Sequence, residues 1–70
     1  MVKSLEVGDK VIYRCDGKEY TIKRVSRAIM VGPVFWFVRE DGEQKTDARF
    51  NYYWNGKEWF PKEEQWRTND

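Results

Sequence analysis

The sequence predicts an all-β fold, a small barrel of about five antiparallel strands in three tight hairpins, with a short C-terminal helical turn. Three observations lead to this fold class. Dipeptides that favour tight hairpin turns occur at intervals suited to a meander: Asp16-Gly17, Asp41-Gly42 and Asn55-Gly56. The segments beside them alternate apolar and polar residues, as half-buried strands do. The 70 residues contain no long linker or repeat, so residues 1–70 form one domain, with residues 67–70 as a frayed tail.

The first hairpin is expected around Asp16-Gly17. A two-residue loop there predicts four pairs of facing residues: Arg14 with Glu19, Tyr13 with Tyr20, Ile12 with Thr21, and Val11 with Ile22. In this register the apolar side chains of both strands share one face. A slip of one residue would turn them outward, so the turn and the pattern support the same hairpin.

The segments on either side of this hairpin bend the chain. Upstream, Val7-Gly8-Asp9 predicts a turn that leads into the first strand. Downstream, Val25 falls out of step with Ile22, which indicates a bulge or bend near Lys23-Arg24. The stretch 26–33 then combines a short strand with a Gly-Pro break, and its register stays open.

The segment from Val34 to Arg39 is apolar on both faces, which predicts a central strand or a strand with one face kept for a partner. Two registers are open for the next hairpin. A two-residue loop at Asp41-Gly42 sets Trp36 opposite Asp47, whereas a three-residue loop that starts at Glu40 pairs Arg39 with Glu43. The two registers place Trp36 on opposite faces of the sheet, so its exposure is undecided.

The third hairpin is the most aromatic part of the chain. A two-residue loop at Asn55-Gly56 predicts these facing pairs: Trp54 with Lys57, Tyr53 with Glu58, Tyr52 with Trp59, and Asn51 with Phe60. Alternation assigns one face to the core, and its aromatic residues are Phe50, Tyr52, Trp54 and Trp59. Tyr53 and Phe60 lie on the other face and are the better candidates for function. After them, Pro61 is expected to begin a helical turn that Trp66 docks.

Cysteine content and hydropathy bound the environment. Cys15 is the single cysteine, so an internal disulfide is excluded and a reducing compartment is the natural expectation. The N-terminal residues have no apolar signal-peptide region, and no stretch approaches a membrane span. We therefore expect a cytoplasmic protein without a membrane partner, as a monomer or weak homodimer.

The net charge of +1 conceals an asymmetry. Residues 1–39 hold eight Lys and Arg against four acids, whereas residues 40–70 hold five against eight. The basic segment 10–27 would attract a polyanion or an acidic protein if the fold gathered its cations on one side. A solvated strand face is the alternative interpretation.

The residue types argue against catalysis. Histidine, the usual proton-transfer residue near neutral pH and the commonest metal ligand, is absent. No cysteine pair suits zinc, and no glycine-rich loop precedes a helix as a phosphate cradle. We expect a non-catalytic protein with no cofactor and no metal site.

A protein partner is the leading functional expectation. A half-closed barrel offers a strand edge and an aromatic groove, and interface hot spots are rich in Trp, Tyr and Arg. The candidate contacts are three aromatic residues and three arginines: Trp36, Tyr53, Phe60, Arg24, Arg39 and Arg49. For the aromatic residues, core filling is the competing role.

Nucleic-acid or nucleotide binding is the alternative, because bases stack on aromatic rings while Lys and Arg follow phosphates. The candidate phosphate contacts lie in the basic segment: Lys10, Lys23, Arg24 and Arg27. Trp36 and Tyr53 are the candidate stacking surfaces. The nearly neutral net charge speaks against a dedicated nucleic-acid binder.

The strand pattern resembles the SH3-like small-barrel superfamily, which includes Tudor-like and KOW-type modules. The resemblance rests on three stretches: residues 7–13 (VGDKVIY), residues 16–22 (DGKEYTI) and the 34–50 hairpin. It implies a barrel that binds peptides, modified side chains or nucleic acids and rarely catalyses. Residues 8–11 (GDKV) followed by residues 17–20 (GKEY) also look slightly like the small carbohydrate-binding modules of chitinases, which continue with a Trp-rich strand where this chain has Lys23-Arg24-Val25. The small size and lack of catalytic groups also suit a bacterial or phage accessory protein, acting as an adaptor or inhibitor.

Overall fold

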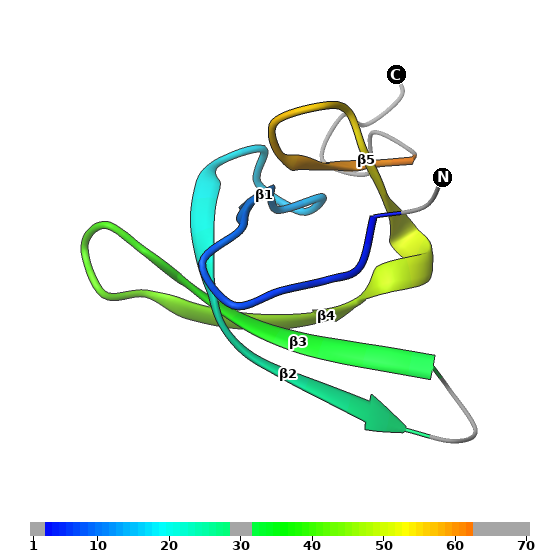
Figure 1. Cartoon of the computed structure of the whole chain (residues 1–70). Coiled ribbons are helices and arrows are strands. Elements are labelled where there is room, and N and C mark those ends of the chain that lie inside the picture. The colour runs from blue at the N-terminus through cyan, green and yellow to red at the C-terminus, as the bar shows by residue number, and fades with distance from the viewer. Residues whose placement is uncertain (1–2, 29–31, 63–70) are drawn as a thin grey trace.

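The computed structural model describes residues 3–28 and 32–62, which form one curled sheet in the shape of a half-barrel (Figure 1). The strands are β1 (Lys10–Ile12), β2 (Glu19–Ala28), β3 (Gly32–Arg39), β4 (Gln44–Ala48), β5 (Tyr52–Trp54) and β6 (Trp59–Pro61). A single 3₁₀ turn, η1 (Arg49–Asn51), separates β4 from β5. The all-β prediction is confirmed, with six strands where about five were expected.

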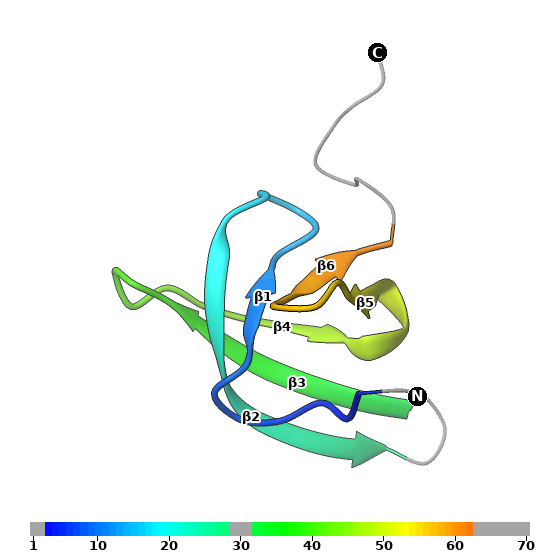
Figure 2. The same ribbon diagram turned by 45° about the horizontal axis from the view of Figure 1, so that its top comes forward.

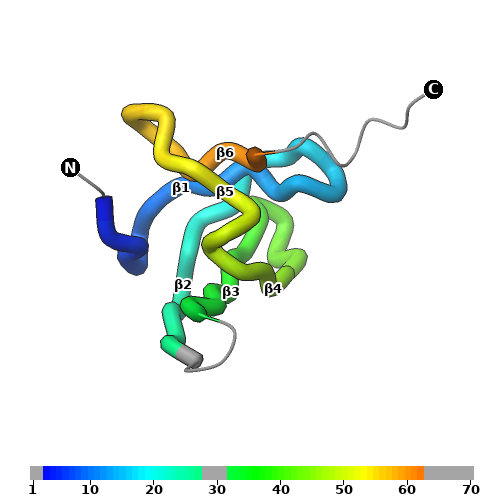
Figure 3. The backbone as a smooth tube through the Cα atoms, turned by 90° about the vertical axis from the view of Figure 1, so that its right-hand side faces the viewer, coloured from blue at the N-terminus to red at the C-terminus, as the bar shows by residue number. Residues whose placement is uncertain are grey.

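The strand order across the sheet is β4-β3-β2-β1-β6-β5. Figures 1 and 3 show β1, β5 and β6 on one side of the half-barrel and the body of β2, β3 and β4 on the other. The long strand β2 curves between these two parts, as Figure 2 shows most clearly. Its pairing with β3 shifts register between Ile22 and Arg24, which confirms the predicted bulge.

The β1–β6 pairing is parallel, with Val11 opposite Trp59, and this corrects the expectation of a purely antiparallel sheet. The other strand pairings are antiparallel. Parallel neighbours need a long connection, and the four intervening strands β2 to β5, together with η1, supply it. Local turn signals indicate only how strands adjacent in the sequence pair, so they contain no information about the β1–β6 pairing.

Two of the three hairpin loops are longer than predicted. Ile12 lies opposite Glu19 and Trp54 opposite Trp59, so each register differs by two residues from the one that a two-residue loop gives. The side chain of Asp16 accepts a hydrogen bond from the Lys18 N–H. The side chain of Asn55 accepts hydrogen bonds from the backbone N–H groups of Lys57 and Glu58. These side-chain caps stabilise wider turns.

A type I′ turn is excluded at both loops, because it needs positive φ at two central residues and the described non-glycine residues have none. The predicted pairing of Arg14 with Glu19 is therefore wrong. The predicted faces are nevertheless correct, since a shift of two residues restores the same side of a strand. Val11, Tyr20 and Ile22 are buried together.

The middle hairpin follows the three-residue alternative. Val38 lies opposite Gln44 and Trp36 opposite Thr46, and the Arg39 N–H donates to the Glu43 carbonyl at 2.8 Å. Gly42 takes a φ of +96°, the conformation that this loop requires of its last residue. Trp36 therefore lies on the sheet face opposite to the buried Phe37.

The core fills the concave side of the half-barrel with Leu5 from the N-terminal segment and with residues from every strand except β4: Val11, Tyr20, Ile22, Phe35, Phe37, Tyr52 and Trp59. Its rings meet mostly edge to face, with centroids 5.1 Å apart for Tyr20 and Phe37 and 5.5 Å apart for Phe35 and Tyr52. Aromatic contacts of this kind add to the stabilisation from area burial alone. They compensate for the few aliphatic residues of the chain.

Two predictions for the third hairpin are wrong. Phe50 was assigned to the core, but η1 interrupts the period-two alternation and leaves its side chain 61% exposed. Pro61 was expected to begin a helical turn, but it is the buried last residue of β6, opposite Tyr52. That pair is flanked by the bond from the Lys62 N–H to the Asn51 carbonyl, so Pro61 occupies a position that needs no donor toward β5. The expected helical turn around Trp66 lies outside the described residues.

Candidate functional site

A groove of about 570 Å³ opens beside η1 and β5, and we call it the aromatic groove. It is lined by residues from the N-terminal segment, the start of β3, η1, β5 and β6: Lys3, Pro33, Arg49, Phe50, Tyr52, Tyr53, Trp54, Trp59 and Lys62. Five of these nine residues are aromatic and three are cations. The Arg49 side chain of η1 bonds to the Lys3 carbonyl, and the Asn51 carbonyl of η1 accepts from the Lys62 N–H, so residues from both ends of the described chain reach one site.

The 3₁₀ turn gives the groove its exposed rings. Phe50 projects from η1 with 61% of its surface exposed, and Tyr53 follows on the outer face of β5 with 46% exposed. Apart from Val7, these are the large apolar side chains that are most exposed in the described part of the chain. The ring of Phe60 lies across from Tyr53, with centroids 6.1 Å apart.

Two cations lie over the tryptophan rings of the groove. The Lys3 ammonium is 4.7 Å from the Trp54 ring centroid, and the Arg49 guanidinium is 5.4 Å from that of Trp59. Arg49 Nη2 also donates to the Lys3 carbonyl at 3.0 Å, and this bond fixes the N-terminal segment against η1. The Trp59 indole is held in turn by a hydrogen bond to Asp9.

The charges of the groove are unbalanced. Among its described lining residues, none is acidic. The Lys3 ammonium is shared with Asp9 at 3.2 Å and Glu6 at 3.7 Å, both outside the lining. Arg49 forms no ion pair with any residue of 3–28 or 32–62, and neither does Lys62. The groove therefore presents a positive potential next to apolar rings.

The floor of the groove rests on a partly buried polar cluster centred on Asp47. The Tyr52 hydroxyl donates to Asp47 Oδ2 at 2.7 Å and accepts from the Arg14 backbone N–H at 3.1 Å. Asn51 Nδ2 donates to the other carboxylate oxygen at 3.2 Å. Burial, together with the hydrogen bond to Asp47, raises the pKa of Tyr52 well above its usual value. The cluster ties η1 and β5 to β4, so the groove is built on a rigid base.

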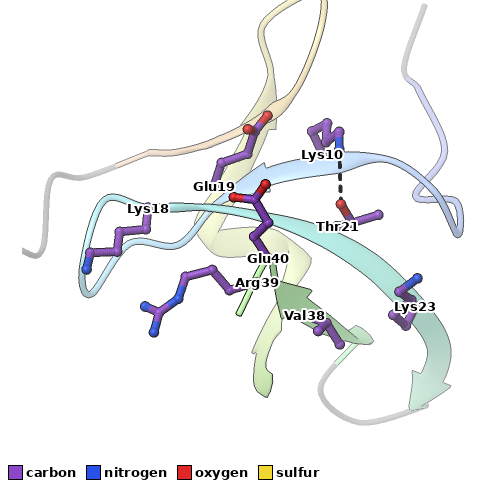
Figure 4. Close-up of a pocket in the computed structure, with 8 residues that line it drawn as sticks. All are labelled: Lys10, Lys18, Glu19, Thr21, Lys23, Val38, Arg39 and Glu40. Atoms are coloured by element: carbon purple, nitrogen blue, oxygen red, sulfur yellow. Dashed lines mark hydrogen bonds between the residues drawn. The ribbon is translucent and has the colours of Figure 1, made fainter. Parts of the chain in front are cut away.

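A second recess, of about 550 Å³, lies over β1, β2 and the end of β3 (Figure 4). Its charged residues have both signs: Lys10, Lys18, Lys23, Arg39, Glu19 and Glu40. In Figure 4 Lys18 and Arg39 extend toward the β1–β2 turn, whereas Lys10 and Lys23 lie at the other end, with Lys10 bonded to Thr21 at 3.1 Å. The cations do not converge on one point.

Arg39 is engaged at the edge of this recess. Its guanidinium donates twice to Asp41, at 2.8 and 3.0 Å, and lies 5.6 Å from the centroid of the Tyr20 ring. The hydrogen bond from Arg39 lowers the pKa of Asp41 to about 2 and raises that of Arg39 itself. A guanidinium committed to a neighbouring carboxylate is a poor candidate for a partner's anion.

Trp36 and Arg24 form a third surface, on the convex face of β2 and β3. The guanidinium of Arg24 lies 4.7 Å from the centroid of the Trp36 ring, and the two residues are cross-strand neighbours. Trp36 is half-buried beside Val34 and Val38, which share its face of β3. This surface shares no residue with the aromatic groove.

The structure thus separates the residues that the sequence proposed as one site. Of the protein-binding candidates, Arg49 and Tyr53 line the groove, and Phe60 lies beside Tyr53. Of the nucleic-acid candidates, Lys10 and Lys23 line the recess, whereas Arg24 stacks on Trp36 and Arg27 lies exposed further along β2. The basic segment 10–27 does not form one patch, since Arg14 also turns away to bind Asp47.

Besides Tyr52, Trp54 and Trp59, which were assigned to the core, sequence reasoning missed four residues of the groove: Lys3, Pro33, Phe50 and Lys62. Phe50 was assigned to the core by alternation, and only a 3₁₀ turn at Arg49–Asn51 would have corrected this. The other three come from distant parts of the chain and carry no local pattern. The absence of acids between residues 48 and 57 was the one available signal.

Within residues 3–28 and 32–62, no helix has the length and apolar character to cross a membrane. The same residues contain no group of three Cys, Asp or Glu side chains that could hold a metal ion.

No protein-family model matches this chain, and no curated protein or solved structure compared with it shows significant similarity. The structure itself establishes a small all-β half-barrel, whose strand arrangement is compatible with an SH3-like small barrel.

Proposed function

We propose that this chain is a non-catalytic binding module that recognises a protein partner through the aromatic groove. One observation carries the proposal: exposed aromatic rings share a groove with Arg49 and Lys62, which form no ion pair within residues 3–28 and 32–62, and the described lining has no acidic residue. Aromatic residues and arginine are the side chains that contribute most to protein interfaces. The volume of about 570 Å³ accommodates a few side chains of a partner.

The energetics favour a binding role for Phe50 and Tyr53. A domain of this size is marginally stable, and leaving two aromatic rings in water forfeits burial that the core could use. Contiguous exposed apolar surface of this kind is typical of interaction sites. The cluster around Asp47 anchors Asn51 and Tyr52, the residues between Phe50 and Tyr53, so little backbone entropy is lost when a partner binds.

The proposal extends to the fold superfamily and to the cellular setting of the protein. We assign the half-barrel to the SH3-like superfamily, whose members generally bind peptides, modified side chains or nucleic acids. We also propose a cytoplasmic adaptor or inhibitor, in keeping with the single cysteine and the lack of histidine. A bacterial or phage accessory protein suits this profile.

The test is a comparison of three tagged proteins as baits in a lysate: the wild type, Phe50→Ala/Tyr53→Ala, and Trp36→Ala. The double variant should lose a partner that the other two retain, because only its substitutions lie in the groove. Two-dimensional ¹H–¹⁵N NMR spectra of each bait would establish that it is folded. Retention of the partner by the double variant and its loss from Trp36→Ala would overturn the groove and indicate the convex face of β2 and β3.

Nucleic-acid binding is the second candidate, and one observation favours it. The exposed rings of Phe50 and Tyr53 adjoin Arg49 and Lys62, as stacking platforms adjoin phosphate contacts. Adding oligodeoxythymidylate should then shift the NMR signals of the groove, with binding that weakens steeply as salt rises. Charge reversal at Arg24 and Arg27 would weaken it further if the convex face contributes. Unchanged spectra at low salt would end this candidate.

A further inference from the structure

The arginines in the described part of the chain differ in their exposure to solvent and in whether a carboxylate of this chain binds them. Arg14 and Arg39 each bind a carboxylate of this chain, at 2.7 and 2.8 Å. Arg24 and Arg27 are exposed to solvent. Arg49 is half-buried yet forms no ion pair within residues 3–28 and 32–62. A partly desolvated guanidinium without a carboxylate partner can readily donate hydrogen bonds to the carboxylate of a ligand.

The position of Arg49 is fixed before any ligand arrives. Its guanidinium lies over the Trp59 ring, and its Nη2 donates to the Lys3 carbonyl at 3.0 Å. A guanidinium has five N–H donors, so most of them stay available for the planar, two-bond contact that arginine makes with a carboxylate. A prepositioned donor loses little side-chain entropy on binding.

The size of the positive charge favours a peptide over a polyanion. Lys3 shares its charge with Asp9 and Glu6, which leaves Arg49 and Lys62 as the groove cations that form no ion pair within residues 3–28 and 32–62. Two cations match one or two carboxylates, whereas nucleic-acid sites carry a row of cations along the backbone.

The edge of the sheet favours an extended ligand. β5 is the last strand in the order β4-β3-β2-β1-β6-β5, so its outer side carries no strand of the described residues. Backbone bonds join Asn51 to Lys62 and Asn55 to Glu58 across to β6. Since antiparallel bonding alternates, the N–H and C=O of Trp54 are directed away from β6, toward the open edge. A bound strand can pair there while its side chains reach the groove.

We propose that the aromatic groove recognises an extended acidic peptide segment, with a partner carboxylate on Arg49 and a neighbouring apolar side chain between Phe50 and Tyr53. This inference rests on the proposed function and specifies the chemistry of its partner. Lys62 adds a second, longer-range attraction for acidic residues. The specificity comes from the combination, because neither the rings nor the guanidinium alone would select such a segment.

The test is a selection from a phage-displayed library of random short peptides against the folded domain, followed by binding measurements with the synthetic winners. We expect winners that combine Asp or Glu with an aromatic or large aliphatic residue at a constant spacing. Arg49→Gln should weaken their binding by at least about tenfold, because a charge-assisted hydrogen bond is lost. The affinity of Arg49→Lys should lie between those of the wild type and Arg49→Gln, since lysine keeps the charge and loses the planar guanidinium group.

A double-mutant cycle tests whether Arg49 contacts the acidic side chain of the peptide directly. Replacing the acid of the winning peptide by its amide should weaken binding to the wild type by a similar factor and have little further effect on Arg49→Gln. Arg24→Gln is the matched control, an arginine stacked on a tryptophan outside the groove, and should leave binding unchanged. The glutamine at position 49 keeps a donor for the Lys3 carbonyl, and NMR spectra would verify the fold.

The outcomes separate this inference from the proposed function. Winners without acids, or acidic winners that bind Arg49→Gln as tightly as the wild type, would overturn the carboxylate contact. If such winners still lost affinity on Phe50→Ala, the groove would remain a protein-binding site. Peptide binding unaffected by both substitutions, or an absence of winners together with binding of oligodeoxythymidylate, would overturn the inference and the proposed function together.

Discussion

Arg14 Nε donates a hydrogen bond to Asp47 Oδ2 at 2.7 Å, which joins the turn between β1 and β2 to the end of β4, 33 residues further along the chain. The carboxylate is 8% exposed and also accepts from the Tyr52 hydroxyl at 2.7 Å. Burial opposes the charge of Arg14, but the hydrogen bond and the charge of Asp47 leave its pKa raised. The pair thus connects the two sides of the half-barrel directly beneath the aromatic groove.

Removing Asp47 should therefore be among the most destabilising polar substitutions in the domain. Asp47→Ala leaves Arg14 and the Tyr52 hydroxyl without their acceptor and should lower the free energy of unfolding by about 3 kcal/mol. Urea denaturation followed by circular dichroism would measure it. Glu43→Ala, which removes the exposed ion pair with Lys45, is the control and should cost less than about 1 kcal/mol. Equal effects of the two substitutions would refute a structural role for the Asp47 cluster.

The turn between β3 and β4 should depend on glycine for its backbone alone. Gly42 has a φ of +96°, and a Cβ built on it meets no atom within 4 Å. Gly42→Ala should thus destabilise the domain by about 1–2 kcal/mol through strain and not through a clash. A chemically synthesised chain with D-alanine at this position is the control, since D-residues favour positive φ. Similar losses for both enantiomers would contradict this explanation.

Adjacent aromatic residues of β3 should respond in opposite ways to truncation. Phe37 is fully buried against Tyr20 and Phe35, so Phe37→Ala should cost about 3–5 kcal/mol and leave the domain largely unfolded. Trp36 lies on the convex face with Arg24, so Trp36→Ala should cost about 1–2 kcal/mol. Thermal melts followed by circular dichroism would compare them. Loss of the fold in both variants would mean that the convex face is covered in solution.

Stability should fall in alkaline solution as buried tyrosines ionise. Burial, and then the hydrogen bond to Asp16, raise the pKa of Tyr20 to about 12. An unfolded tyrosine titrates near about 10, so its contribution to stability is complete below pH 10 and is lost as pH rises toward 12. Melting temperatures measured across this range should fall less steeply for Tyr20→Phe. Parallel curves for the variant and the wild type would show that this hydroxyl is not linked to folding.

The strand faces could be predicted from the sequence because alternation survives a register shift of two. Val11, Tyr20, Ile22, Tyr52 and Trp59 all lie on the predicted core side, although the first and third loops are each longer than expected. The loop lengths could not be predicted, because Asp16 and Asn55 cap their turns through side-chain bonds that a dipeptide rule ignores. Phe50 was misplaced for a similar reason, since one 3₁₀ turn breaks the alternation.

By itself, the sequence determined the all-β class, the core faces and the bulge in β2, because each depends on a period of two residues or on a local departure from it. Only the tertiary structure decided that β6 lies parallel to β1 and that Lys3, Arg49 and Lys62 meet around exposed rings. These contacts join residues more than ten positions apart, and no local pattern encodes them. The groove exists because both ends of the described chain bond to η1, Lys3 to the side chain of Arg49 and Lys62 to the carbonyl of Asn51.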